Sequence, residues 1–542
     1  MRWIPLLVLA SAQFIMVLDT TVMNVAITQV VGDLDTTVQR MQAAITLYTL
    51  VMAAFMLTGG KLGDIFGRRR AFVGGLAIYG TGSLITAVSP NIQTLYFGWS
   101  LIEGLGAALV IPAIAALVVS TYQGADRAIA YGMLGGVAAA GIAVGPVIGG
   151  FVTTYLSWRY VFVAESVLVI VVIFMRGRLV APPQSARAPR LDIVGTLASA
   201  TGLILIVYGI LQSSAWGWVR PNGAATIGGR EVTPFGFSVV PFLIAAGLVV
   251  LGLFQAWEER QLRNGQDVLL DVRMLRVPQL RSGLMSLAAM QMCILGLFFV
   301  IPVYMQIVLG FDAFATGLRL MPLSIAMFVA AMFGPRIAKR FAPRRIVWSG
   351  LSIMLLGSLG MVGVVDPPFS MMGFSIATAL FGIGAGLLAS QLGNVIMSSV
   401  THDRSSEAGG LQGTAQNLGA SLGTALIGSV LLASLTTGVV TEVTTNPDLS
   451  EPVRQGVLDS ASAGVPIITI DQLDQALIEA GVEDDDRAAV NASYAAAQSF
   501  GLKEAVGAVA SLALLGFFMS RGLPTRPISE SVPVDVNELQ PT

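Results

Sequence analysis

Charged residues are scarce in this chain of 542 residues, where Asp, Glu, Lys and Arg together make up 12%. Soluble domains carry about 25% charged residues, so this composition leaves too few to cover a globular surface in contact with water. Hydrophobic residues make up 54% of the chain, and its mean hydropathy is +0.76. The composition therefore excludes a soluble globular protein and favours one whose main solvent is lipid.

Cysteine and histidine are almost absent, with one residue of each, Cys293 and His402. One cysteine cannot form an intramolecular disulfide, and this pair cannot provide a Cys/His metal site. The single histidine weakens any catalytic triad, and the sequence has no G-x-x-x-x-G-K-[ST] loop for ATP. A net charge of −1 provides no basic field for nucleic acid. We therefore expect no enzyme activity, no metal, no cofactor, and neither ATP nor nucleic acid as a partner.

Long apolar runs recur along the whole sequence. Each run can cross about 30 Å of hydrocarbon at about 1.5 Å per residue, which predicts an all-α polytopic membrane protein. The first run continues to Val31, so we interpret it as an uncleaved helix rather than a signal peptide. The fourteen predicted spans are residues 4–28, 41–60, 71–89, 93–120, 128–154, 158–175, 192–212, 235–256, 282–309, 315–335, 345–365, 370–392, 407–435 and 502–520.

Lysine and arginine are distributed unevenly between the connecting segments, and this asymmetry predicts the orientation. With a cytoplasmic N-terminus, 23 of the 31 basic residues fall on the cytoplasmic side and 8 fall outside. An even number of spans then places the C-terminus in the cytoplasm as well. We expect a multi-pass protein of the plasma (cell inner) membrane.

The spans divide into two sets of six with an inserted pair between them. A basic loop at residues 60–70 has a fainter counterpart at residues 334–345, after the second span of each set. Such repetition is typical of transporters built from duplicated halves. The predicted domains are the N-terminal half at 1–176, a cytoplasmic linker at 177–191, the inserted pair at 192–257, a second linker at 258–281, the C-terminal half at 282–521 and a cytoplasmic tail at 522–542.

The one sizeable segment predicted outside the membrane is an acidic exterior loop at residues 436–499, within the C-terminal half. It contains eleven acidic residues and two arginines. Leu473, Leu477 and Ile478 recur at helical spacing, which favours a short amphipathic helix. We interpret the loop as a solvated cap, with an acidic vestibule that attracts substrate as the alternative.

The loop between the second and third spans reads GKLGDIFGRRR, from Gly60 to Arg70. Its glycines allow two helices and a tight turn to approach closely. Its aspartate can accept hydrogen bonds from a neighbouring helix N-terminus, and its arginines anchor the cytoplasmic face. We predict a conformational gate here rather than a substrate site. The proposed gate residues are Gly60, Asp64, Gly67, Arg68 and Arg69.

Together with four further stretches, this loop resembles the major facilitator superfamily, specifically its fourteen-helix drug:proton antiporters. LDTTVMNVA at residues 18–26 resembles that family's first-helix motif, and GIAVGPVIGG at residues 141–150 resembles its helix 5 antiporter motif. Trp158-Arg159 opens helix 6, and LDIVG at residues 191–195 opens the inserted pair, as in that family. The resemblance implies two six-helix halves plus two inserted helices. It also implies proton-driven export by alternating access.

The helix 5 stretch carries three glycines four residues apart, on one helix face, where they permit close packing in a bilayer. Its proline removes a helical hydrogen bond and favours a kink. Ordinary small-residue packing is one interpretation, and the resemblance implies a hinge or seal between transport states. The residues of the proposed hinge are Gly141, Gly145, Pro146 and Gly149.

Three acidic residues, Asp19, Glu103 and Glu165, lie inside apolar spans. A charge in the bilayer core costs at least about 2.5–3.5 kcal/mol, so each needs a partner, water or a proton. Removal from water favours the neutral form of a carboxyl group, which suits a proton carrier. We expect Asp19 and Glu103 to line the central cavity and to share protonation. Glu165 is a third candidate for proton coupling, with an interfacial pair to Arg159 as the alternative.

The chain departs from the resembled family around its cavity. The family's helix 4 motif R-x-x-Q-G-x-G is replaced by SLIEGLG at residues 100–106, so the arginine is missing and Glu103 stands in the glutamine position. Glu165 stands where the family usually has asparagine, and Gln416 where an arginine is common. Relative to the resembled family, the cavity has gained carboxylates and lost basic side chains. Such a cavity favours lipophilic cations as substrates. The aromatic and amide candidates for substrate contact are Phe14, Tyr48, Trp99, Tyr304, Gln306 and Gln391.

The sequence thus predicts a multidrug efflux transporter of the antibiotic-resistance type, which exchanges drugs or toxic compounds for protons. Its partners would be a lipophilic small molecule, protons and membrane lipids. A lipid or lipid-like metabolite exporter of the same fold is the main alternative. A proton-driven importer and a non-transporting membrane sensor or assembly partner are further alternatives.

Overall fold

The computed structural model describes residues 3–179, 190–221, 225–227, 230–365, 370–401, 404–461 and 464–526. These residues are almost entirely helical, apart from one antiparallel hairpin of β1 (Ala225–Ile227) and β2 (Arg230–Val232). The all-α fold class is therefore confirmed. His402, most of the predicted linker 177–191 and most of the predicted tail 522–542 lie outside the described residues.

The described helices include a counterpart for each of the fourteen predicted spans. Thirteen of these counterparts are long and apolar enough to cross a membrane, and α4, whose hydropathy is lowered by arginines and glycines, is the exception. The first set comprises α1 (Ile4–Val25), α3 (Val38–Phe66), α4 (Arg68–Ala87), the run of α5 (Ile92–Leu95), π-helix η1 (Tyr96–Glu103) and α6 (Gly104–Thr121), then α7 (Gly124–Tyr155) and α8 (Arg159–Phe174).

The inserted pair and the second set follow in chain order. The pair is α9 (Ile193–Leu211) and α11 (Val240–Arg263). The second set is α12 (Pro278–Val303) with π-helix η5 (Tyr304–Val308), α13 (Ala313–Ile337), α14 (Pro343–Val364), α15 (Met371–Ser398), α16 (Ser405–Thr445) and α19 (Asp484–Met519). The short helices are α2 (Ile27–Asp33), η2 (Met175–Arg178), α10 (Ser213–Trp216), η3 (Pro234–Gly236), η4 (Val272–Arg276), α17 (Glu451–Ala461), α18 (Ile470–Glu479) and η7 (Ser520–Gly522).

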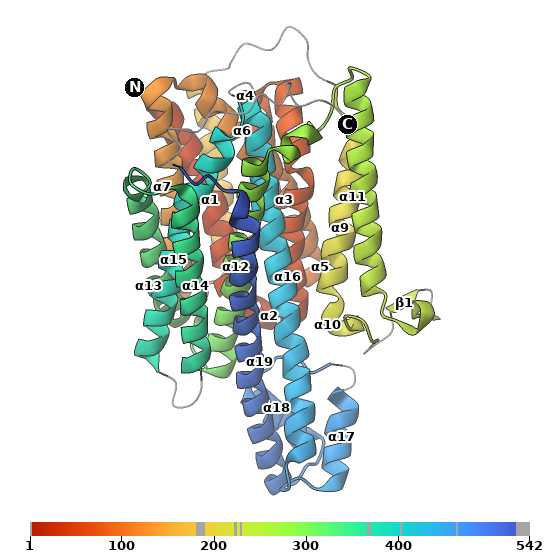
Figure 1. Cartoon of the computed structure of the whole chain (residues 1–542). Helices are drawn as coiled ribbons and strands as arrows, with labels where there is room; N and C mark the ends of the chain where they lie inside the picture. The colour runs from red at the N-terminus through yellow and green to blue at the C-terminus, as the bar shows by residue number, and fades with distance from the viewer. Residues whose placement is uncertain are drawn as a thin grey trace.

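The long helices run side by side as one bundle (Figure 1). The two ends of the described chain lie at one end of this bundle, and a helical extension projects from the opposite end. The inserted pair α9 and α11 stands on one side of the bundle, and α13 stands on the other. The bundle therefore has one side with the inserted pair and one with α13, and one end with the chain termini and one with the extension.

On the side of the inserted pair, α3 of the first set and α16 of the second form a continuous seam. Ser421 Oγ of α16 donates to the Thr46 carbonyl of α3 at 2.9 Å. Helix α9 lies over this seam and contacts both helices. Thr58 Oγ1 of α3 donates to Thr196 Oγ1 of α9 at 3.3 Å. Ser429 Oγ of α16 donates to a carbonyl of α9 at 3.2 Å. The inserted pair is thus attached to both sets of helices at once.

On the other side, α7 of the first set packs against α13 of the second at the end from which the extension projects. A Cβ added to Gly150 would overlap the carbonyl oxygen of Ala313, and one added to Gly317 would overlap that of Pro146. Backbone contact this close between neighbouring helices requires glycine on one of them. The two sets are therefore in direct backbone contact at this end.

Toward the end that holds the chain termini, this contact is lost. Ser324 Oγ of α13 still donates to the Ile142 carbonyl of α7 at 3.3 Å. Farther along α7, a Cβ added to Gly132, Gly135 or Gly136 would meet nothing within 4 Å. Backbone contact between α7 and α13 is therefore found at the extension end, and we call the stretch toward the termini, where α7 leaves these glycines exposed, the α7–α13 opening.

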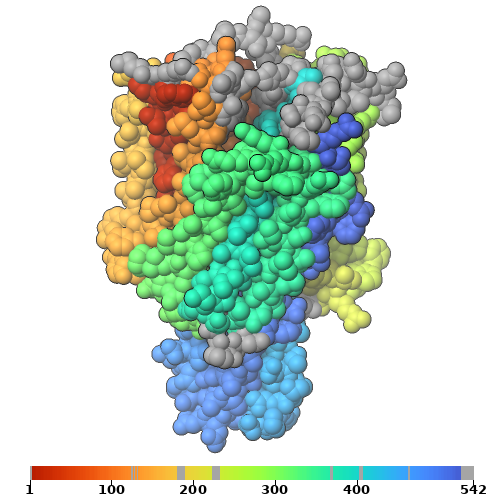
Figure 2. Space-filling view, turned by 60° about the vertical axis from the view of Figure 1, so that its left-hand side comes forward, coloured from red at the N-terminus to blue at the C-terminus, as the bar shows by residue number. Residues whose placement is uncertain are grey.

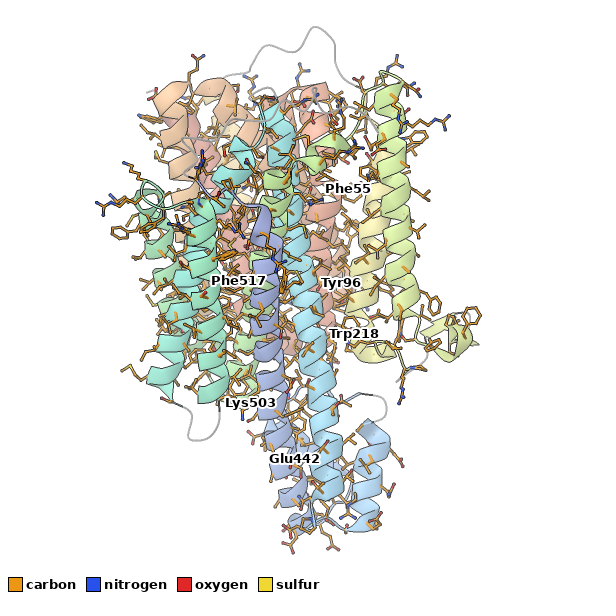
Figure 3. The ribbon with its side chains drawn as sticks, viewed as in Figure 1. Phe55, Tyr96, Trp218, Glu442, Lys503 and Phe517 are labelled. Atoms are coloured by element: carbon orange, nitrogen blue, oxygen red, sulfur yellow. The ribbon has the colours of Figure 1, made fainter. Side chains whose placement is uncertain are left out.

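The segment predicted as an acidic exterior loop, residues 436–499, is largely helical and forms the extension. Helix α16 continues to Thr445, α17 and α18 follow, and α19 already begins at Asp484. Alanine is the strongest helix former and acids stabilise a first turn, which explains why DDDRAAVNASYAAA at 484–497 extends α19 outward. Figure 2 shows the extension as a compact blue projection. In Figure 3, Glu442 lies on it and Lys503 lies near its junction with the bundle.

Candidate functional site

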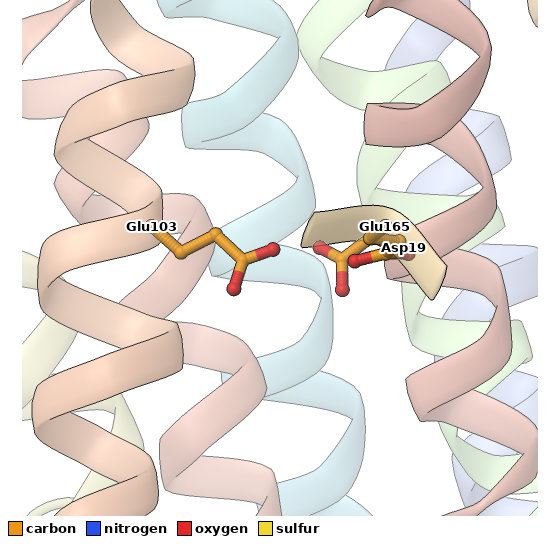
Figure 4. A group of neighbouring side chains, drawn as sticks. All are labelled: Asp19, Glu103 and Glu165. Carbon is orange, nitrogen blue, oxygen red and sulfur yellow. The ribbon is translucent and has the colours of Figure 1, made fainter. Parts of the chain in front are cut away.

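The three acids predicted inside the membrane come together in the first set of helices (Figure 4). One carboxylate oxygen each from Asp19 of α1, Glu103 of η1 and Glu165 of α8 lies within 4.8 Å of the other two. Asp19 and Glu103 are 0% exposed, and Glu165 is 2% exposed. The alternative pair between Glu165 and Arg159 is not formed, because Arg159 Nη1 instead pairs with Asp33 Oδ2 at 2.7 Å. We call these three residues the acid cluster.

Local backbone features bring Glu103 into the acid cluster. Glu103 ends the π-helical turn η1, a wider turn that often occurs at functional sites. Helix α4 packs directly behind it, since a Cβ added to Gly82 would lie 2.5 Å from the Glu103 backbone nitrogen. A glycine at position 82 is therefore needed for α4 to approach η1 closely enough to enclose the cluster.

Two of the predicted substrate contacts, Trp99 and Tyr48, pack beside the acid cluster, and their role toward a substrate stays a prediction. Trp99 Nε1 donates to Asp19 Oδ1 at 3.0 Å and to Asp19 Oδ2 at 3.2 Å. The Tyr48 ring stacks on the Trp99 ring with 4.8 Å between their centroids and 7° between their planes. Both side chains are buried. Asp19 itself is 0% exposed, so in this state it is out of reach of any molecule between the two sets of helices.

Several oxygens of the acid cluster lack a hydrogen-bond partner among the described residues. Ser83 Oγ of α4 donates to Glu165 Oε2 at 3.2 Å. The other Glu165 oxygen and both Glu103 oxygens accept nothing. The buried hydroxyls of two tyrosines lie against the cluster, with Tyr48 beside Asp19 and Tyr79 beside Glu103. Buried polar atoms without partners are rare, so this group of residues has unused capacity to bind protons or cations.

No basic side chain in the described ranges forms an ion pair with the acid cluster. Three ionised carboxylates this close would repel one another, and each would also lose its hydration. The cluster must therefore hold positive charge from outside the chain, and protons are the simplest source. Two or three protons shared by three carboxyl groups would titrate as one coupled unit.

The predicted gate loop connects α3 and α4 at the end that holds the chain termini. Gly67 has φ +94°, a backbone conformation that favours glycine. Arg68 Nη2 pairs with Asp64 Oδ1 at 3.4 Å, and Arg68 Nη1 donates to the Ala116 carbonyl at 3.3 Å. Arg69 Nη1 donates to the Leu179 carbonyl at 3.5 Å. Gly60 faces α6, since a Cβ added to Gly60 would lie 3.7 Å from the Cβ of Pro112.

We predict that Asp64→Asn weakens transport by changing the conformational equilibrium and leaves substrate affinity within about twofold of wild type. The ion pair with Arg68 is partly exposed and is worth about 0.2–1 kcal/mol, so its loss shifts the balance of states modestly. Binding of a fluorescent substrate to purified protein and thiol labelling of the α7–α13 opening measure the two effects separately. Glu442→Gln, on the extension, is the control. Lost binding with unchanged labelling would contradict a gate role.

The antiporter-motif residues of α7 contact two different helices. Three of its glycines face α1. A Cβ added to Gly141 would come within 2.9 Å of Val17, and one added to Gly149 would come within 2.7 Å of Val22. A Cβ added to Gly145 would overlap the Thr21 hydroxyl. Pro146 and Gly150 face α13 of the second set. Helix α7 therefore lies between α1, which carries Asp19, and the helix of the other set from which it separates.

The remaining predicted substrate contacts hold helices together. Gln306 of η5 donates to the Val25 carbonyl at 3.0 Å and accepts from the Thr28 hydroxyl, which joins the two sets at the extension end. Gln391 of α15 donates to the Gly334 carbonyl of α13 at 3.3 Å. Phe14 lies half-buried beside Gly141, and Tyr304 is buried in η5. Their roles as substrate contacts stay predictions.

Helix α4 contributes to the acid cluster in a way that was not predicted from the sequence. Tyr79, Gly82 and Ser83 all face the cluster from α4. Their spacing places them on one helix face, and that spacing was the available signal. It is weak, because small and hydroxyl-bearing residues occur throughout these helices.

Comparison with known proteins adds to this geometry. The family model described as Major Facilitator Superfamily matches residues 9–424. The chain belongs to the major facilitator superfamily. The match runs from α1 into α16, so it includes the first set, the inserted pair and most of the second set, and the predicted resemblance to this superfamily is confirmed.

Three relatives of this superfamily member are an antibiotic resistance protein, an antibiotic export protein and a multidrug efflux pump. It is 29% identical over 437 residues to the puromycin resistance protein pur8 of Streptomyces alboniger, with 79% of this chain and 82% of that protein covered. It is 30% identical over 427 residues to the cephamycin export protein CmcT of Amycolatopsis lactamdurans, with 78% and 83% covered. It is 25% identical over 474 residues to the multidrug efflux pump LfrA of Mycolicibacterium smegmatis, with 87% and 89% covered.

Solved structures show the same major facilitator fold. A bacterial homolog of the human lysosomal transporter Spinster superposes with a TM-score of 0.60 at 14% identity, covering 96% of this chain and 97% of that one. An auto-inhibited POT family peptide transporter gives a TM-score of 0.59 at 13% identity, with 99% of each chain covered. The superfamily match, the apolar helices and the exporter relatives together identify the protein as a multi-pass membrane transporter of small molecules and not an enzyme.

Proposed function

We propose that this transporter exports lipophilic cationic drugs or toxic compounds across the plasma (cell inner) membrane in exchange for protons, by alternating access. The observation that carries the proposal is the acid cluster, which is buried in the bundle without a basic partner among the described residues. Relatives that export antibiotics or drugs support the direction and the substrate class. No ATP or cofactor takes part, and the proton gradient supplies the free energy.

The orientation follows from the basic residues, which place both termini in the cytoplasm. The bundle then opens toward the cytoplasm between α7 and α13 and is closed toward the exterior, where the extension lies. Substrate enters this cytoplasmic opening. Protons reach the acid cluster when the bundle opens to the outside, and they leave it when the bundle opens inward. Net transport requires that protonation changes the affinity for substrate in one state relative to the other.

Trp99 is the proposed link between proton and substrate. Its indole N–H donates to the Asp19 carboxylate, and protonation of that carboxylate weakens a charge-assisted hydrogen bond. The Trp99 and Tyr48 rings are then free to move as a stacked pair. The carboxylates would thus affect a substrate through these two rings, without touching it in the state described here.

Transport by purified protein in liposomes tests the proposal. Vesicles with an imposed pH difference, in choline-based buffer without Na⁺, should accumulate a lipophilic monocation such as ethidium and should discharge the pH gradient in step. A lipophilic anion of similar size is the matched control and should not be accumulated. Ethidium movement that is indifferent to the pH difference would contradict the proposal.

A lipid or lipid-like metabolite is a second candidate substrate, and a groove on the second set favours it. The groove has a volume of about 640 Å³ and is lined by apolar residues of α13 and α15, among them Leu318, Ile325, Phe333, Ile383 and Leu387. It adjoins the helix that borders the cytoplasmic opening. Accumulation of a lipid in a deletion strain, with unchanged drug tolerance, would favour this candidate over the first.

A further inference from the structure

The apolar groove between α13 and α15 is built on two helices that hold each other firmly. Its residues on α13 recur three or four positions apart, so they share one helix face. A Cβ added to Gly382 of α15 would overlap the carbonyl oxygen of Leu323 on α13, and one added to Gly386 would overlap that of Met327. Helices in backbone contact keep their relative position, so the groove exists before any ligand arrives.

The groove faces outward, away from the contact between the two sets. The side of the bundle that carries α13 is turned toward the viewer in Figure 2. Helix α13 contacts α7 through Gly317 and Ser324, which do not line the groove. The lining runs from Leu318 to Ile337, about 28 Å at about 1.5 Å per residue, and so follows α13 across most of the hydrocarbon. In a bilayer this groove is open to the acyl chains of lipids.

Basic side chains stand at the end of the groove that is cytoplasmic in the proposed orientation. Ile337 ends α13 and lines the groove there. Arg336, Lys339 and Arg340 are exposed and lie within one turn of it along the chain. The Arg336 guanidinium lies over the ring of Phe333, a groove residue, 5.3 Å from the ring centroid. None of the three basic side chains forms an ion pair with another described residue.

The corresponding loop of the first set uses its charges differently. When the two loops are aligned on their first glycines, Asp64 corresponds to Ala338. In the first set, Asp64 pairs with Arg68 at 3.4 Å. Residues 334–345 of the second set contain five basic residues and no acid. The second copy has therefore kept the positive charge without the acid that would pair with it, and this charge is available to an anionic ligand.

We propose that the groove binds a phospholipid with an anionic headgroup, with an acyl chain along α13 and the phosphate at Arg336 and Arg340. Basic residues at the cytoplasmic surface of a membrane attract anionic lipids, and the planar guanidinium of arginine suits phosphate. The cytoplasmic leaflet as the source of this lipid rests on the orientation in the proposed function. Binding itself goes beyond that function, because it is expected whichever compound is exported. Since both helices of the groove belong to the second set, the bound lipid moves with that set.

Thermal unfolding of the purified full-length transporter tests this binding without any transport. The protein in a neutral detergent is titrated with dioleoyl phosphatidylglycerol, and separately with dioleoyl phosphatidylcholine, which has the same chains and no net charge. Saturating phosphatidylglycerol should raise the Tm by about 2 °C or more, and phosphatidylcholine at the same concentration should raise it less. Glycerol phosphate, which has no acyl chains, should leave the Tm unchanged.

One pair of double variants tests the headgroup contact. Arg336→Gln/Arg340→Gln should weaken the apparent affinity for phosphatidylglycerol about 30-fold, since each basic residue near the membrane surface contributes about fivefold. Arg260→Gln/Arg263→Gln removes the same charge from the last turn of α11, on the other side of the bundle, and should retain the affinity. The comparison separates a site at the groove from a general attraction to the basic surface.

A second pair of variants tests the acyl-chain contact. Ala326 lines the middle of the groove, so the ring in Ala326→Phe occupies space that the chain would fill. The affinity for phosphatidylglycerol should fall about fivefold or more. Ala246→Phe makes the same change at an exposed position of α11 and should retain the affinity. The Tm of each variant without added lipid shows whether it folds.

Three results would contradict the proposed lipid site. The first is equal stabilisation of the wild type by the two phospholipids. The second is an equal loss of affinity in the two double variants, which would indicate attraction by surface charge alone. The third is full affinity in Ala326→Phe, which would leave the acyl chain outside the groove. Because every readout is binding, ethidium export can fail while lipid binding succeeds, and the reverse.

Discussion

In the Asp19→Asn and Glu103→Gln variants, the steady-state accumulation of a lipophilic cation should fall from about 100-fold to about onefold at a pH difference of two units. One pH unit corresponds to about 1.36 kcal/mol, a tenfold gradient, for each proton exchanged. Asn and Gln keep the size of the side chain but cannot give up a proton. Either change removes one of the three carboxyl groups that share protons, and so disrupts the coupled unit that is proposed to exchange one proton for each substrate.

Flux and binding measured in the same vesicles distinguish lost coupling from lost folding. Substrate binding and downhill movement of substrate should persist in both variants, because neither side chain is exposed to the space between the two sets of helices. Glu442→Gln, an acid on the extension, is the control and should accumulate substrate as the wild type does. Full accumulation in both cluster variants would remove Asp19 and Glu103 from the coupling mechanism.

Gly150→Ala should shift the conformational equilibrium by about 5- to 150-fold toward the state in which α7 and α13 separate at the extension end. The added Cβ would overlap the Ala313 carbonyl oxygen, a backbone atom that cannot move without the helix. Overpacking of this kind costs about 1–3 kcal/mol, and such a coupling energy corresponds to that range of populations. The strain is released when the helices part.

Gly136→Ala on the same helix is the matched control, because its added Cβ meets nothing within 4 Å. Both changes replace glycine with alanine inside α7, so their effects on helix propensity cancel in the comparison. The readout is labelling of Ser324→Cys, a position 1% exposed at the α7–α13 contact, in a Cys293→Ser background. Equal labelling rates in the two alanine variants would show that this contact does not limit the transition.

The sequence predicted helix positions well because burial in lipid requires long apolar runs, and such runs are visible in any window. The sequence predicted helix ends poorly where helix propensity, rather than burial in lipid, determines how far a helix extends. Helix α19 extends outward to Asp484 through an alanine-rich segment that is helical without being apolar. Composition of that kind was interpreted as a loop because only hydropathy was used to define the spans.

Asp19 and Glu103 could be chosen from the sequence because each is an acid in an apolar run, and their depths along the helices are similar. The role of Glu165, the third acid of the cluster, could not be predicted in the same way. Residue number gives the depth of Glu165 along α8 but not the direction in which its side chain points. Ser83 on α4 and the pairing of Arg159 with Asp33 settle that direction, and both depend on how α8 is rotated in the bundle.

The attachment of α9 to both α3 and α16 has a geometric consequence for alternating access. Hydrogen bonds from Thr58 to Thr196 and from Ser429 to the end of α9 connect the inserted helix to both sets. A relative rotation that preserves these bonds must have its axis along the α3–α16 seam. Displacement then grows with distance from that axis and is largest at α7 and α13. A symmetrical duplication is thereby converted into a molecule with one fixed edge and one moving edge.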